Sequence, residues 1–119
     1  MRKLISGKVR DVFLVNQKQL VIVTTDRISA FDVIMDTSIP EKGKVLNSLT
    51  KFWFDYTKDI VSNHMISCEM KDMPEQFHKP EFSERIMLVK KLKMIPFEFV
   101  VRGYIFGNLW KEYQKNDVI

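Results

Sequence analysis

Cysteine, histidine and long apolar runs are scarce in this sequence, and each scarcity excludes a class of protein. Cys68 is the only cysteine, so an internal disulfide and a cysteine-based metal cluster are both excluded. A single cysteine also fits a reducing compartment. His64 and His78 are the only histidines, and neither has a partner at the spacing of a metal site or a catalytic triad. We therefore expect both histidines at the surface.

The sequence has no apolar segment of the length that a signal peptide or a membrane span requires. Its basic start, MRKLISGKVRD, lacks the apolar core of about 7–15 residues that defines a signal peptide. No later segment is long enough to cross a bilayer. Repeats, low-complexity tracts and linkers are also absent. We expect a soluble, cytoplasmic protein that forms a single lobe over residues 1–119.

The composition is that of an ordinary globular domain. Hydrophobic residues make up 45% and charged residues 29% of the 119 residues, which is enough to bury one modest core. The formal net charge of +4 suits an anionic small molecule, although an ordinary solvated surface also explains it.

The first half of the sequence predicts a β-hairpin followed by a helix. A β-rich segment, residues 3–15, and the run LVIVTT flank a turn at Asn16–Gln19. Gly7 inside the first strand marks either a bulge or a close approach of the backbone to another group. Residues 44–63 have the clearest helical periodicity, ending at Asn63. Its apolar face, which we expect to pack in the core, consists of Leu46, Leu49, Trp53, Tyr56 and Ile60.

The second half predicts further strands and the start of a helix. A short strand at residues 64–70 precedes a proline-containing loop at residues 71–82. Strands are expected at residues 85–93 and 95–105, and a helix begins in GNLWKEYQKNDVI. In the second of these strands Phe97, Phe99 and Val101 form an apolar face, while Glu98 and Arg102 form either a salt bridge or part of a site. The order of elements predicts an α+β fold: an antiparallel-rich twisted sheet with one main helix.

Three polar segments are candidates for chemistry. SGKVRD places Gly7 beside Lys8 and Arg10, an arrangement that suits a polyphosphate although it is not a Walker motif. DRISAFD follows directly on a buried strand, where functional loops are often held. EKGKVLN precedes the main helix, so its amide groups could face an anion. Each segment also has a simple turn or capping explanation.

Taken in order, several segments resemble one enzyme family. GKVRDVF, DRISAFDVIM, IPEKGKVLNSLTKFWF and VKKLKMIPFEFVVRGYIFGNLWKEY are similar to phosphoribosylaminoimidazole-succinocarboxamide synthases, the SAICAR synthetases, from about Leu4 to Tyr113. The resemblance implies the N-terminal ATP-binding lobe of an ATP-dependent ligase of purine biosynthesis. Residues 1–93 would form the sheet and main helix, and residues 94–119 the hinge, a substrate-side strand and the start of the next helix.

The resemblance also implies substrates, cofactors and site residues. Such ligases use ATP and Mg²⁺ to join carboxyaminoimidazole ribonucleotide to L-aspartate through an acyl phosphate; homo-oligomerisation stays open. The implied ATP-binding residues are Gly7, Lys8, Val9, Arg10 and Met94, with Lys8 and Arg10 the candidates for a catalytic role. The implied substrate-binding residues are Arg102 and Asn108, with Asp26, Ser29 and Asp32 as further candidates, and no metal ligand is expected in this chain.

Two departures from the family pattern leave alternatives open. Phe106, Gly107 and Asn108 stand where the family has a small residue followed by Gly-Ser. This difference leaves open the affinity for the substrate, or even its identity, at these positions. The family's later signature, D-x-K-x-E-F-G, is absent, so we expect little or no turnover by this chain alone. A non-catalytic nucleotide-binding fragment is one alternative. An RNA-binding domain is another, because Arg102–Phe106 partly matches an RNA-recognition motif.

Overall fold

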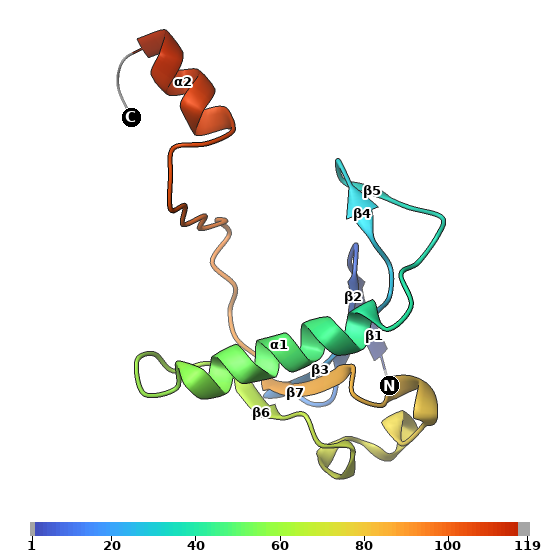
Figure 1. Ribbon diagram of the computed structural model, residues 1–119. Coiled ribbons are helices and arrows are strands. Elements are labelled where there is room, and N and C mark those ends of the chain that lie inside the picture. Colours follow the sequence, from blue (N-terminus) through green and yellow to red (C-terminus); the bar gives the residue numbers. More distant parts are fainter. Residues whose placement is uncertain (1, 117–119) are drawn as a thin grey trace.

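An antiparallel five-stranded sheet forms the centre of the structure, which is a computed structural model that describes residues 2–116 (Figure 1). The predicted α+β class is confirmed. Across the sheet the strands run in the order β1 (Arg2–Ser6), β2 (Arg10–Leu14), β3 (Gln19–Thr24), β7 (Ile86–Lys90) and β6 (Met65–Ser67). The strand expected at residues 64–70 is therefore present, and shorter than expected.

The first strand predicted from the sequence is wrong, because it is two strands. The chain turns at Gly7, and β1 and β2 pair antiparallel, with Ser6 opposite Asp11. The expected turn at Asn16–Gln19 is confirmed, since the Val15 N–H donates to the Gln19 carbonyl at 3.1 Å. The first 25 residues thus form a three-stranded meander in place of a hairpin.

One face of the sheet packs on a segment that the sequence predicts to be only a loop. Residues 70–82 form three short 3₁₀ turns, η1 (Met70–Asp72), η2 (Glu75–Phe77) and η3 (Pro80–Phe82). Phe77 from this segment lies against Phe13 and Phe82, with ring centroids 5.3 and 5.2 Å apart. The buried core on this face consists of Val21, Val23, Met73, Phe77, Ile86 and Leu88.

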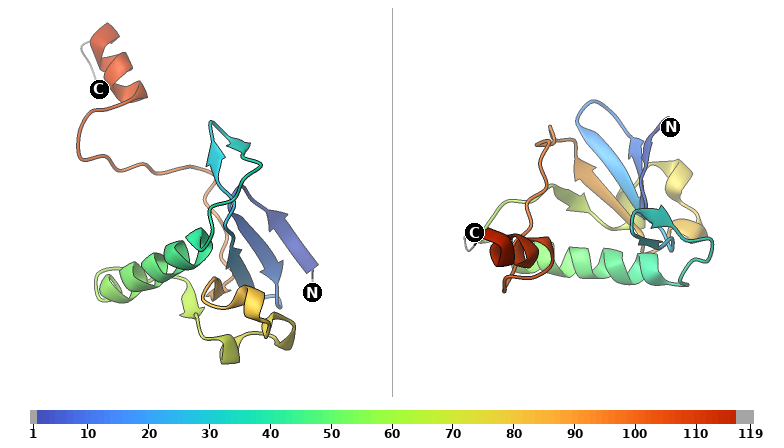
Figure 2. Two further views of the ribbon diagram at one scale, coloured as in Figure 1. Left: turned by 45° about the vertical axis from the view of Figure 1, so that its right-hand side comes forward. Right: turned by 90° about the horizontal axis from the view of Figure 1, so that it is seen from above.

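The other face of the sheet is covered by α1 (Lys42–Tyr56), as Figure 2 shows from two sides. The helix is shorter than the predicted 44–63, and its predicted packing face is wrong. Trp53 and Tyr56 are 55% and 68% exposed, whereas Gly43 and Asn47 are buried. The Asn47 side chain donates to the carbonyls of Glu84 and Ile86, at 3.1 and 3.2 Å. Small and polar residues let this helix approach the sheet closely.

A small hairpin projects beyond the sheet after β3. Its strands are β4 (Ser29–Ala30) and β5 (Val33–Ile34), joined through Phe31 and Asp32. Both joining residues have positive φ, 49° and 67°, as a tight hairpin turn requires. The sequence reading did not predict this hairpin, because neither residue is a glycine.

The C-terminal part of the chain leaves the sheet as an extended segment and ends in α2 (Asn108–Asn116) (Figure 1). The strand predicted at residues 95–105 is wrong, because the sheets of the described residues offer it no neighbouring strand. No Glu98–Arg102 ion pair forms within the described part. The Cα radius of gyration is 17.2 Å, against about 13.5 Å for a compact chain of this length. The last residues of the predicted helix, 117–119, lie outside the described residues.

Candidate functional site

The turn between β1 and β2, which consists of Gly7, Lys8 and Val9 and is called the glycine turn below, is the best-defined candidate site. The Gly7 N–H donates to the Arg10 carbonyl at 2.7 Å, and this bond closes the turn. A Cβ atom at Gly7 would lie 3.0 Å from the same carbonyl oxygen, so a larger residue would widen the turn. Gly7 was expected to mark either a bulge or a close approach of the backbone to another group. The structure supports a close approach, to the Arg10 carbonyl.

The two basic side chains of this turn point to different places. Lys8 Nζ forms an ion pair with Asp32 Oδ1 on the β4–β5 hairpin, and this hydrogen bond lowers the pKa of the Asp32 carboxyl. Two predicted site residues are thereby brought together. Arg10 lies on the sheet face that α1 covers, and it makes no ion pair within residues 2–116.

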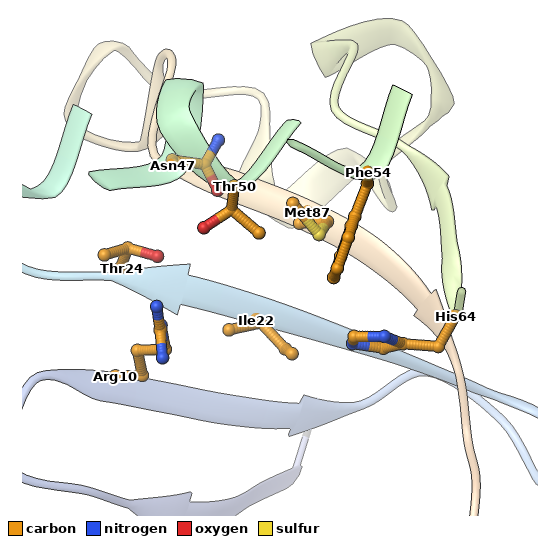
Figure 3. A pocket seen from close by; sticks show the side chains of 8 residues that line it. All are labelled: Arg10, Ile22, Thr24, Asn47, Thr50, Phe54, His64 and Met87. Carbon is orange, nitrogen blue, oxygen red and sulfur yellow. The ribbon is translucent and has the colours of Figure 1, made fainter. Parts of the chain in front are cut away.

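Arg10 lines a cavity of about 260 Å³ between α1 and the sheet (Figure 3). The other lining residues are Ile22, Thr24, Asn47, Thr50, Phe54, His64 and Met87. His64 is half-buried and its ring lies 5.4 Å from that of Phe54, so it is not the surface residue we expected, whereas His78 is exposed as expected. Burial lowers the pKa of His64. Because ligand pockets usually span about 300–1,000 Å³, this cavity is small for a whole nucleotide.

Asp26, the first acidic residue of DRISAFD, holds the start of α1. Its Oδ1 accepts hydrogen bonds from the Gly43 N–H and from Arg85 Nη1, both at 2.8 Å. These contacts, led by the Gly43 bond, lower the pKa of Asp26. The amide groups of EKGKVLN could face an anion, and in the structure the Gly43 N–H meets the Asp26 carboxylate of the chain itself. A contact of Asp26 or Ser29 with substrate stays a prediction.

The other predicted site residues lie far from the glycine turn. Met94 is 83% exposed and follows β7, at the end of the sheet where Gln19 pairs with Lys90. The glycine turn is at the opposite end, where Arg10 pairs with Thr24. Thr24 and Gln19, which mark the two ends, are five residue steps apart along β3, a span of about 17 Å. Arg102 lies further along the extended segment and Asn108 begins α2, and the structure brings neither residue to the turn.

The RNA-binding alternative requires Arg102–Phe106 to lie on a strand of a sheet, where its aromatic rings could stack on bases. In the structure this segment belongs to no strand. The motif therefore lacks the structural setting that the RNA-binding hypothesis needs.

Neither helix of the part of the chain that the structure describes, residues 2–116, could span a membrane.

Sequence reasoning missed two residues at the turn, Asp11 and Arg27. Asp11 is 8% exposed, and its carboxylate accepts hydrogen bonds from Arg27 Nη2 at 2.7 Å, Ser6 Oγ at 2.8 Å and Lys3 Nζ at 3.0 Å. A charged residue within the β-rich pattern RDVFLV was the available signal, since a buried carboxylate needs partners.

Asp11 predicts a pH dependence of stability. Burial opposes its ionisation, but the hydrogen bonds from Arg27, Lys3 and Ser6 outweigh burial and lower its pKa from 3.8 to about 2. Because the folded pKa is the lower one, this contribution of about 2 kcal/mol is complete above pH ~4 and is lost as the pH falls towards ~2. Urea unfolding across this range should show wild type losing its stability advantage over Asp11→Asn. An advantage that does not change with pH would contradict this assignment.

The fold and the turn define a class: a sheet-and-helix lobe whose glycine turn carries two cations. The family model described as SAICAR synthetase matches residues 3–118. The chain belongs to the SAICAR synthetase family.

Individual relatives agree with the family match. A phosphoribosylaminoimidazole-succinocarboxamide synthase of Lachnospira eligens is 54% identical over 116 residues, which are 98% of this chain and 39% of the relative. The SAICAR synthase of Saccharomyces cerevisiae, solved in complex with SAICAR, superposes with a TM-score of 0.90 at 42% identity, over 99% of this chain and 42% of that one. A SAICAR synthetase solved with ADP shares the fold, with a TM-score of 0.71 at 22% identity over 91% of this chain and 41% of that one. The chain thus spans about two fifths of the length of these relatives.

Proposed function

We propose that this chain is the N-terminal, nucleotide-binding part of a cytoplasmic ligase. The whole enzyme would join carboxyaminoimidazole ribonucleotide and L-aspartate, with conversion of ATP to ADP and phosphate. The observation that carries the proposal is the family match over residues 3–118. The glycine turn supports it, because it places Lys8 and Arg10 beside a tightly closed backbone turn that suits an anion.

The chemistry of amide formation explains why such a site is needed. A carboxylate is a poor acyl donor, so its oxygen first attacks the γ-phosphorus of ATP, and ADP leaves. The aspartate amine then attacks the acyl carbon of this acyl phosphate, loses a proton, and phosphate leaves. The protein contributes mainly positioning and charge stabilisation to such a reaction.

The chain supplies several of these contributions. Lys8 and Val9 would approach the phosphates through backbone N–H groups, while the Gly7 N–H closes the turn on the Arg10 carbonyl. Lys8 and Arg10 would offset the negative charge of the phosphates. Met94 would meet adenine through its backbone, and Arg102 and Asn108 would bind the ribonucleotide. Arg102 suits that role because its forked guanidinium can contact phosphate or carboxylate in two places.

Magnesium is implied by the family. Within residues 2–116 no three His, Cys, Asp or Glu side chains gather in a metal-binding group. Magnesium bound to a nucleotide usually takes its ligands from phosphate oxygens, water and one or two carboxylates, and we assign no step to the ion.

Exposed apolar surface favours a chain that works together with further sequence. Phe97, Phe99 and Val101 are 75%, 77% and 98% exposed, on a segment that no strand within residues 2–116 pairs with. The second candidate function is a non-catalytic nucleotide-binding fragment. It is favoured because Arg102 and Asn108, the residues implied to bind the ribonucleotide, do not lie beside the glycine turn. Both candidates require nucleotide binding at the glycine turn.

Titration of the chain with Mg-ATP, followed by amide NMR, tests this requirement. We expect shifts concentrated at Gly7–Asp11 and around Met94, with affinity unchanged in the control Lys71→Ala, an exposed residue of η1 on the face of the sheet opposite α1. A well-dispersed spectrum in which millimolar ATP moves neither segment would contradict the proposal.

A further inference from the structure

The carbonyl groups of the glycine turn are all held from one side, by the segment that follows β3. The Val9 carbonyl accepts hydrogen bonds from the Thr25 N–H and from Thr25 Oγ1, both at 2.9 Å. The guanidinium of Arg27 donates to the Gly7 carbonyl through Nη2 at 2.9 Å and to the Lys8 carbonyl through Nε at 3.3 Å. Three consecutive carbonyls therefore face Thr25 and Arg27.

This arrangement determines where the N–H groups of the turn point. In a planar trans peptide the carbonyl and the next N–H point in opposite directions. With the carbonyls of Gly7 and Lys8 directed at Arg27, the N–H groups of Lys8 and Val9 are directed away from it. Neither N–H has an acceptor within the described residues. Two adjacent free N–H groups beside cationic side chains form a suitable site for an anion.

The guanidinium of Arg27 is itself held in place. Its Nη2 also donates to Asp11 Oδ1 at 2.7 Å, and Asp11 is fixed by Ser6 and Lys3 on the neighbouring strand. The side chain of Asp11 is 12% exposed and that of Arg27 is 30% exposed, so water competes weakly for this pair. A forked guanidinium can bind a carboxylate and two carbonyls at once, whereas a lysine ammonium cannot reproduce that geometry.

We propose that Arg27, oriented by Asp11, is a positioning residue for the phosphate groups of the nucleotide: it holds the carbonyls of the glycine turn so that the N–H groups of Lys8 and Val9 face the ligand. This inference rests on the proposed nucleotide site. It also assigns a role to Arg27, the arginine of DRISAFD, which is to hold the carbonyl groups of the glycine turn in place.

The test compares wild type with Arg27→Lys and Asp11→Asn, and uses Lys51→Ala as the matched control. Lys51 also pairs with an aspartate, Asp55 at 2.9 Å, but on the outer surface of α1. Arg27→Lys keeps the charge and removes the fork. The probes are Mg-ATP, inorganic tripolyphosphate and adenosine, with amide NMR to follow Lys8, Val9 and Met94 and thermal unfolding to confirm the fold.

We expect Arg27→Lys to bind Mg-ATP and tripolyphosphate about tenfold more weakly, which corresponds to about 1.4 kcal/mol. The adenosine response at Met94 and the behaviour of Lys51→Ala should match wild type. Asp11→Asn should weaken the two phosphate probes in the same way as Arg27→Lys.

Three outcomes would overturn the proposal. Unchanged phosphate affinity in Arg27→Lys would reject the positioning role and leave the proposed function intact. Equal losses for adenosine and phosphate would show general structural damage instead of phosphate positioning. A wild-type chain in which neither Mg-ATP nor tripolyphosphate moves Lys8 and Val9 would reject the phosphate site, and the proposed function of this chain with it.

Discussion

Replacing Gly43 with alanine should destabilise the fold by about 3 kcal/mol, although alanine is the better helix former. A Cβ atom at this position would lie 2.4 Å from the Thr24 carbonyl oxygen and 3.0 Å from Asp26 Oδ1. Helix propensity favours alanine over glycine by only about 1 kcal/mol. Overpacking costs about 1–3 kcal/mol, and weakening the charge-assisted bond from the Gly43 N–H to Asp26 adds about 1.5–3 kcal/mol.

Urea unfolding of Gly43→Ala and Gly103→Ala measures this difference. A Cβ atom at Gly103 would have no heavy atom within 4 Å, so its substitution should change the free energy of unfolding by less than about 0.5 kcal/mol. Equal stability of Gly43→Ala and wild type would show that α1 does not lie as close to β3 as the structure has it.

The close approach at Gly43 also explains why the packing face of α1 could not be predicted from the sequence. The helix is apolar on more than one side, and the predicted packing face was the side with the largest residues, including Trp53 and Tyr56. The structure instead packs Gly43 and Asn47 on the sheet, because a short distance between helix and strand admits only small side chains or ones that bond the backbone.

Local patterns predicted elements well where the local signal is strong. The turn at Asn16–Gln19 follows from its turn residues, and strand β7 from its apolar run, although its partner β3 lies far away in sequence. The 3₁₀ segment at residues 70–82 was read as a loop because prolines interrupt its pattern, yet Phe77 is only 3% exposed. The segment 95–105 has the alternation of a strand, but strand formation requires a neighbour that local sequence does not reveal.

The candidate site was predictable in part. A glycine beside Lys8 and Arg10 indicated a candidate site for phosphate, and phosphate binding by this turn stays a prediction. The structure adds the pairing of Lys8 with Asp32. Arg27 and Asp11 were missed because they lie 16 residues apart and meet only when β2 and β3 pair. Met94 is separated from the turn by the length of the sheet. Arg102 is separated from it by the extended segment, which no local pattern predicts.

Turnover by a fused chain tests the central claim most directly. Residues 1–119 would be joined to the part of the Lachnospira eligens relative that follows the matched region, which restores a chain of family length. We expect little or no aspartate-dependent ADP release from the 119-residue chain alone, and ADP release with formation of the succinocarboxamide product from the fusion. The relative's C-terminal part alone should be inactive, and Lys8→Ala in the fusion should lower the rate. A folded fusion that binds Mg-ATP without forming product, or robust turnover by the 119-residue chain alone, would contradict the account.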